Sequence, residues 1–120
     1  MVLVRPDDES LQSTCRTWTE QFPENIQIID SEENEGTAFD IAVVHELTED
    51  QLDLIKDFRQ VPIAAKGKIE PFDPIEEKGS GFIYDEGNSW TLFAALVRAS
   101  ETFRFPYDWM NLVKAVQRII

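Results

Sequence analysis

Two kinds of hydrophobic spacing alternate along the chain. Short, nearly continuous apolar runs predict buried strands, and they lie at residues 2–4, 26–29, 39–44 and 61–65. Elsewhere apolar side chains recur every three or four residues, which predicts amphipathic helices. The four helical stripes are Leu11, Cys15, Trp18 and Phe22; Leu52, Ile55 and Phe58; Trp90, Phe93, Leu96 and Val97; and Trp109, Leu112, Val113, Val116 and Ile120. Strands alternating with helices predict an α/β domain whose parallel sheet carries helices on both faces.

The ends of three predicted helices are marked by particular residues. Pro23 ends the first helix, because proline lacks the amide hydrogen that a helix interior needs. Thr48 and Gln51 have the spacing of a capping box, so the second helix is expected to begin there. Asn88 or Ser89 supplies the N-cap of the third.

Length and composition limit the class of protein. We expect residues 1–120 to form a single domain, with the 42% hydrophobic content of a globular chain. The lone Cys15 excludes an internal disulfide and favours a reducing compartment, where we expect it to be a small buried side chain. No apolar run approaches the roughly 18 residues of a membrane span, and the N-terminus lacks a basic leader. We therefore expect a cytoplasmic protein.

The chain is strongly acidic, with 23 acidic and 11 basic residues and a formal net charge of −12. This balance argues against nucleic acid and anionic membranes as direct ligands, because both are bound largely through Lys and Arg. A basic protein partner remains compatible with it, since opposite charge steers association.

Four segments together resemble the response-regulator receiver family. They are residues 2–9, with a doubled aspartate after the first strand, then 39–44, 61–63 and 103–118. The last of these contains an aromatic, a proline, a tyrosine and an aspartate before an amphipathic helix. The resemblance implies a single receiver-like domain with a doubly wound, mainly parallel, five-stranded sheet of the flavodoxin-like or CheY-like type. Residues 66–87 depart from the family pattern, because they are longer than the usual connection between the fourth strand and the fourth helix, so we expect an irregular insertion there.

Two registers fit the C-terminal half. In the first, residues 102–105 form the fifth strand, and residues 66–87 hold the insertion with an extra strand inside it. In the second, residues 81–84 form the fifth strand and the C-terminal helix is an addition. We favour the first register, because the C-terminal segment matches the receiver pattern far better.

The resemblance also shows which receiver chemistry is missing. Asp7 and Asp8 resemble the magnesium-binding pair, but we favour a role in capping the following helix over metal binding. His45 stands where the phosphoacceptor aspartate is expected, Phe105 stands where the family has a lysine, and residues 65–67 contain no serine or threonine. The sequence therefore predicts a pseudo-receiver that is not an enzyme, needs no cofactor and takes part in signalling independently of phosphorylation.

In receivers the fourth helix, fifth strand and fifth helix form the usual partner and dimer surface. The residues that this assigns to an interaction surface are Phe103, Arg104, Phe105, Tyr107 and Trp109. Exposed aromatic side chains suit an interface with a protein partner or a second copy, and packing into the core explains them equally well.

Two other hypotheses remain open. One is an enzyme or phosphocarrier with a rebuilt site, in which His45, Asp7, Asp8 and Glu46 converge at the carboxyl edge of the sheet. The other is an acidic inhibitor or immunity-type protein that binds a basic partner electrostatically. The first requires those side chains to share one pocket, and the second requires binding that weakens as salt rises.

Overall fold

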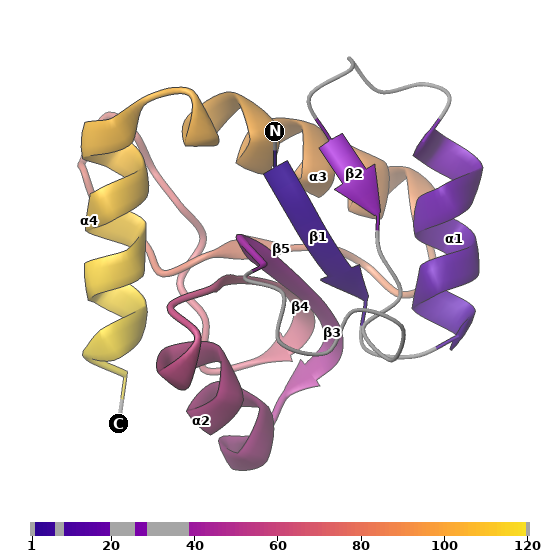
Figure 1. Ribbon diagram of the computed structural model, residues 1–120, viewed down its shortest axis with the longest axis horizontal. Coiled ribbons are helices and arrows are strands. Elements are labelled where there is room, and N and C mark those ends of the chain that lie inside the picture. The colour runs from indigo at the N-terminus through magenta and orange to yellow at the C-terminus, as the bar shows by residue number, and fades with distance from the viewer. Residues whose placement is uncertain (1, 7–8, 20–25, 29–38, 120) are drawn as a thin grey trace.

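The computed structural model describes residues 2–6, 9–19, 26–28 and 39–119 (Figure 1). Its strands are β1 (Val2–Pro6), β2 (Ile26–Ile28), β3 (Ile41–Leu47), β4 (Val61–Gly67) and the two-residue β5 (Phe82–Ile83). They pair in parallel in the order β2-β1-β3-β4-β5. The strand order reverses direction between β1 and β3, and it is compatible with a flavodoxin-like fold.

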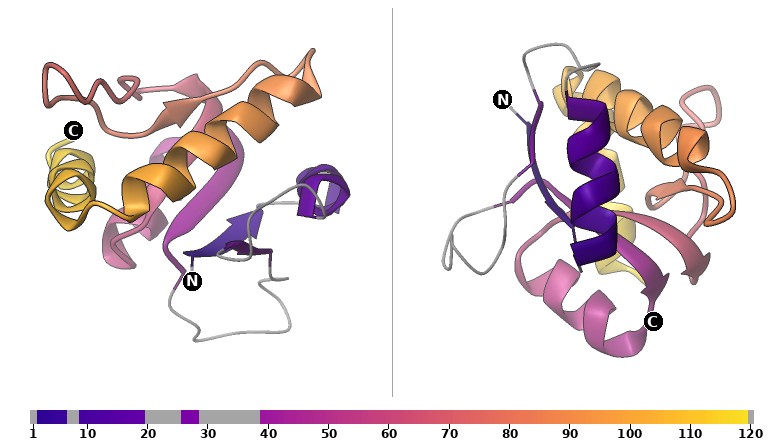
Figure 2. Two further views of the ribbon diagram at one scale, coloured as in Figure 1. Left: turned by 90° about the horizontal axis from the view of Figure 1, so that it is seen from above. Right: turned by 90° about the vertical axis from the view of Figure 1, so that its right-hand side faces the viewer.

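Helices cover both faces of this sheet (Figure 2). The described helices are α1 (Glu9–Thr19), α2 (Glu49–Asp57), α3 (Ser89–Phe103) and α4 (Pro106–Gln117). The buried side chains of α1 and α3 pack on one face, whereas those of α2 pack on the other. The predicted α/β class, with a parallel sheet between helices, is confirmed. No helix among the described residues is long and apolar enough to cross a membrane.

The C-terminal helix α4 belongs to both halves of the core. Its Leu112 and Val113 pack with the α1–α3 cluster, whereas Val116 packs with the α2 cluster. The end of α4 is also tied to α2, because the Gln117 side chain donates a hydrogen bond of 2.9 Å to the carbonyl of Lys56. The helix is therefore an integral part of the packed domain.

The predicted caps of the second and third helices are confirmed. The Thr48 hydroxyl accepts a hydrogen bond of 3.2 Å from the Gln51 amide at the start of α2. The Asn88 side-chain oxygen accepts one of 3.1 Å from the Trp90 amide at the start of α3. Each oxygen satisfies one of the amide groups that a helix start leaves without an intrahelical partner.

Two aromatic side chains that the helical spacing placed inward are exposed instead. Phe58 is 59% exposed because α2 has already ended there and Phe58 is its C-cap. Trp90 is 63% exposed in the first turn of α3, where its ring packs edge-on against Phe93 of the same helix. Spacing identifies the apolar stripe of a helix, but it does not show how much of that stripe the sheet covers.

The strand expected at residues 102–105 is wrong. Thr102 and Phe103 end α3, Arg104 is its C-cap, and Phe105 is the N-cap of α4. The helical period continues through this segment, because Phe103 follows the buried Leu96 and Ala99 on the same stripe. Packing of that stripe against the sheet overrides the strand propensity of the local run.

The other register is correct for the last strand. Within the predicted range 81–84, Phe82 and Ile83 form β5 and pair in parallel with Ile63 and Ala64 of β4. The segment after β5 then continues into two helices joined by a tight turn at Arg104, rather than into a helix, a strand and a second helix.

The segment between β4 and β5 folds back on itself. Asp73 and Lys78 exchange backbone hydrogen bonds of 2.8 and 3.2 Å, and the Ser80 amide donates one of 2.8 Å to the carbonyl of Glu70. Gly79 has a φ of +118°, and a Cβ there would lie 2.4 Å from the Cα of Phe72. Only glycine permits this close approach of the two backbones.

Candidate functional site

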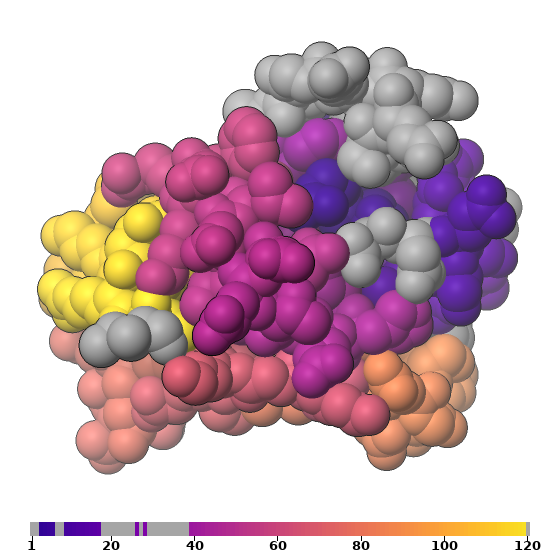
Figure 3. Space-filling model, turned by 90° about the horizontal axis from the view of Figure 1, so that it is seen from below, coloured from indigo at the N-terminus to yellow at the C-terminus, as the bar shows by residue number. Residues whose placement is uncertain are grey.

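A cavity of about 190 Å³ lies at the carboxyl edge of the sheet, beside the point where the strand order reverses. Open α/β sheets bind ligands at this position, because neighbouring loops there run to opposite faces. The cavity is lined from α1 by Ser10, Leu11 and Thr14, from β3 by His45, and from the β5–α3 region by Tyr84, Asp85, Glu86, Ser89 and Leu92. Figure 3 looks toward this edge and shows the start of α3 (orange) beside the end of β3 (magenta).

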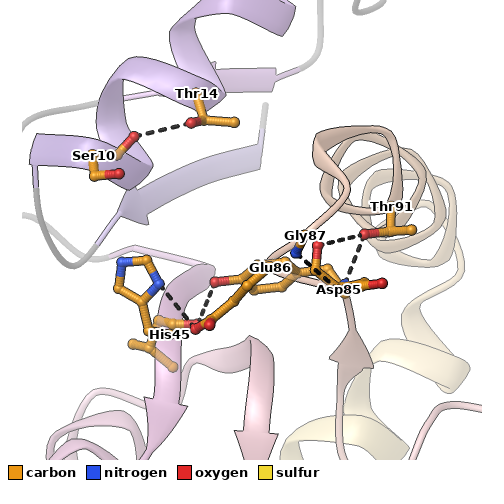
Figure 4. Close-up of polar contacts among 9 residues, drawn as sticks. Ser10, Thr14, His45, Asp85, Glu86, Gly87 and Thr91 are labelled. Carbon is orange, nitrogen blue, oxygen red and sulfur yellow. Dashed lines mark hydrogen bonds and ion pairs between the residues drawn. The ribbon is translucent and has the colours of Figure 1, made fainter.

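His45 and Glu86 connect two walls of the cavity (Figure 4). The His45 Nδ1 lies 3.3 Å from Glu86 Oε1, and both side chains are partly exposed. The contact is an ion pair when the imidazole is protonated, and such solvated pairs contribute only about 0–1 kcal/mol. The pair joins the turn after β5 to the end of β3 across the cavity.

The turn that carries Glu86 is fixed by its own hydrogen bonds. The Asp85 carboxylate accepts a hydrogen bond of 2.9 Å from the Gly87 amide, and the Thr91 hydroxyl accepts one of 2.7 Å from the Asp85 amide. The Thr91 hydroxyl lies 2.6 Å from the carbonyl of Asn88, to which it can donate. The Asp85 carboxylate is thus engaged within the turn, whereas the Glu86 side chain extends toward His45 (Figure 4).

Tyr84 forms the inner wall of the cavity. Its side chain is buried, and its hydroxyl donates a hydrogen bond of 3.1 Å to the carbonyl of Val44 on β3. Tyr84 directly follows β5, so it stands at the carboxyl end of the last strand. Once β5 is placed correctly, this tyrosine occupies the position that the first register gave to Phe105.

The side chains expected to form a rebuilt catalytic site are not brought together among the described residues. His45 lines the cavity, whereas Glu46 is exposed and lies outside the lining. Asp40 lies at the amino end of β3, where its carboxylate accepts a hydrogen bond of 2.9 Å from the Leu3 amide. Asp7 and Asp8, the magnesium candidates, lie outside the described residues.

The described ranges offer no other obvious reactive centre. They contain no group of three or more His, Cys, Asp and Glu side chains placed to hold a metal ion. Cys15 is fully buried, and burial raises the pKa of its thiol to about 12. At neutral pH the thiol therefore stays protonated and is a poor nucleophile.

The five residues predicted as an interaction surface divide into two groups. Phe103 and Trp109 are half-buried against the core, and their rings meet edge-on with centroids 5.0 Å apart. Arg104, Phe105 and Tyr107 are exposed. Packing therefore accounts for two of the four aromatic side chains, whereas Phe105 and Tyr107 remain available to a partner.

A second hollow, which the sequence did not indicate, lies next to Phe105. This groove has a volume of about 290 Å³ and is mainly apolar. Its lining comes from three segments: Phe72, Pro74 and Phe82; Val97, Arg98, Glu101 and Thr102 of α3; and Phe105 and Asp108 at the start of α4. The groove depends on the turn between α3 and α4, which is why a prediction with a strand at 102–105 missed it.

Comparison with known proteins gives a partial similarity over part of the chain. No protein-family model matches the chain. A stretch of 47 residues is 43% identical to glycogen synthase 1 of Synechocystis sp. (strain ATCC 27184 / PCC 6803 / Kazusa). That stretch is 39% of this chain and 10% of the synthase, so the chain matches only about a tenth of that protein.

Proposed function

We propose that this chain is a receiver-like regulatory domain that acts by binding another protein, independently of phosphorylation and without catalysis. The strand order supports the receiver-like organisation. The observation that carries the proposal is the set of side chains at the carboxyl ends of the strands. His45 follows the four buried residues that begin β3, and Tyr84 follows β5. Residues 65–67 at the end of β4 include no hydroxyl side chain.

These side chains are poorly suited to phosphoryl transfer. The reaction needs cations and hydrogen-bond donors around the transferring group, because negative charge must be stabilised in the transition state. Here Asp85 and Glu86 add negative charge to the cavity lining, and the Tyr84 hydroxyl already donates to a backbone carbonyl. The exposed Phe105 and Tyr107 support the other half of the proposal, because aromatic side chains are enriched at protein interfaces.

Mass spectrometry under native conditions tests the absence of phosphorylation. We expect incubation with acetyl phosphate and Mg²⁺ to add no phosphoryl mass, while a typical receiver domain treated in parallel gains one. A stable gain of one phosphoryl group would overturn the proposal. The residue carrying it would then be sought by replacing His45, Glu46 and Asp40 one at a time.

The similarity to a glycogen synthase favours a second candidate function, the binding of a glucan. Carboxylates, an imidazole and hydroxyls line the carboxyl-edge cavity, and all of these form hydrogen bonds with sugar hydroxyls. Leu11, Tyr84 and Leu92 supply the apolar wall that such a site also needs.

Sedimentation with glycogen separates this candidate from the first. If the cavity binds glucan, the chain should pellet with glycogen, and His45→Ala should lose at least about three-quarters of the bound fraction. Arg16→Ala, an exposed change on α1 outside the cavity, is the matched control. Sedimentation no greater than without glycogen would eliminate the glucan hypothesis.

A further inference from the structure

We propose that the groove beside Phe105 receives an apolar side chain from a positively charged segment of a partner protein. This inference rests on the proposed function, because it names the surface and the partner chemistry of the same binding role. It stands on three features of the groove: its apolar interior, an exposed aromatic side chain at its rim, and its acidic surroundings.

The interior of the groove is formed by aromatic and aliphatic side chains. Phe82 is buried, Phe72 is half-buried, and their ring centroids are 6.0 Å apart. Val97 adds an aliphatic side. A volume of about 290 Å³ accommodates one large apolar side chain, whose binding would bury apolar surface of both partners.

Phe105 is exposed although its backbone is held in place. It is the N-cap of α4, with φ −111° and ψ 96°, and Pro106 restricts it to this extended conformation. Its side chain makes no capping hydrogen bond, whereas serine, threonine, aspartate or asparagine would stabilise the helix start. Neither capping nor core packing accounts for a phenylalanine that is 58% exposed here. An exposed aromatic side chain on a restricted backbone, at the rim of an apolar groove, is suited to anchoring a partner.

Other exposed apolar side chains on α4 lie outside the groove. Tyr107 and Met110 are exposed, but neither belongs to the groove lining. Trp109 is half-buried and packs against Phe103. Phe105 is therefore the aromatic side chain of this segment that the groove presents to a partner.

The charges around the groove select a basic partner. Glu101 and Asp108 belong to its lining, and Asp73, Glu76 and Glu77 belong to the neighbouring segment between β4 and β5. Three cations offset part of that charge: Arg98 of the lining, Lys78 of that segment, and Arg104, which lies 3.6 Å from Glu101. Five carboxylates against three cations still leave the surroundings acidic. The net charge of −12 disfavours a second copy of the chain and attracts a segment rich in lysine or arginine.

A short synthetic peptide tests the inference. The probe is an acetylated and amidated hexapeptide, Lys-Lys-Leu-Trp-Lys-Lys, titrated into the isotope-labelled chain while amide chemical shifts are recorded. We expect the shifts to concentrate at the groove and the start of α4. Phe105→Ala should weaken binding at least tenfold, whereas Phe58→Ala should leave it unchanged. Phe58 is a matched control because it is 59% exposed and is the C-cap of α2, which packs on the other face of the sheet.

A second peptide, Lys-Lys-Ser-Ser-Lys-Lys, separates groove binding from charge attraction. We expect it to bind at least tenfold more weakly than the first. Equal binding of the two peptides, or no effect of Phe105→Ala, would overturn the inference. A concentration-dependent dimer in sedimentation that Phe105→Ala abolishes would also overturn it and assign the groove to a second copy. Failure of the proposed function would appear as added phosphoryl mass after incubation with acetyl phosphate. The peptide and sedimentation experiments measure binding instead, so failure of this inference is distinguishable from that result.

Discussion

Gly79→Ala is expected to lower the free energy of unfolding by about 3 kcal/mol or more. Gly79 has a φ of +118°, which alanine adopts only with strain. An added Cβ would also lie 2.4 Å from the Cα of Phe72 and 2.6 Å from the carbonyl oxygen of Pro71. Both contacts are with backbone, so a rotated side chain cannot relieve them. Urea denaturation followed by circular dichroism measures the loss.

Gly87→Ala is the matched control for this change. Its φ is not in the left-handed region, and a Cβ there would meet only the Asp85 carboxylate, at 3.4 Å. We expect its stability to stay within about 0.5 kcal/mol of the parent chain. If Gly79→Ala were equally mild, the segment between β4 and β5 would have to be free to rearrange, and the wall that it contributes to the groove would not be fixed.

The sequence predicts those parts of the fold that short-range physics determines. The apolar runs at 39–44 and 61–65 correspond to the buried residues of β3 and β4, because strands covered on both faces need apolar side chains on both. The caps at Thr48 and Asn88 were predictable for a similar reason. A side-chain oxygen within a few residues of a helix start is sufficient to satisfy its free amides.

The C-terminal segment shows where such reasoning fails. The run 102–105 has strand propensity, but it also continues a helical stripe, and the local sequence does not decide between the two. Contacts of Ala99 and Phe103 with the sheet decide it, and those contacts join residues far apart in the chain. A match to the receiver pattern favoured the wrong alternative, because the pattern describes the order of residues and not their packing.

The candidate site was predictable only in part for the same reason. His45 was expected at the carboxyl end of a central strand, and it lies there. Its contact with Glu86 does not follow from a last strand at 102–105, because Glu86 then lies inside the insertion. With β5 at Phe82–Ile83, the turn that contains Glu86 lies at the carboxyl edge of the sheet, next to His45. The groove beside Phe105 was also missed because of the strand predicted at 102–105. Its lining comes partly from the end of α3 and the start of α4, which are adjacent only because α3 turns directly into α4.

Leu112→Ala is expected to destabilise the domain by about 3 kcal/mol, within the range of about 2–5 kcal/mol for a leucine deleted from a core. Leu112 is fully buried and packs in the α1–α3 cluster. Its loss leaves a cavity that the surrounding helices can fill only partly. Because domains of this size have about 5–15 kcal/mol of stability in total, the midpoint of urea denaturation should fall by a large fraction.

Met110→Ala, two residues away on the exposed side of α4, serves as the control and should change stability by no more than about 0.5 kcal/mol. If Leu112→Ala were as mild as Met110→Ala, α4 would be an addition to a domain that is already complete without it. That result would also weaken the binding proposal, because Phe105 is held at the groove by the junction of α3 with α4. A large loss at Leu112 with none at Met110 would mean that α4 stabilises the core through its buried side and holds Phe105 in place at the start of the helix.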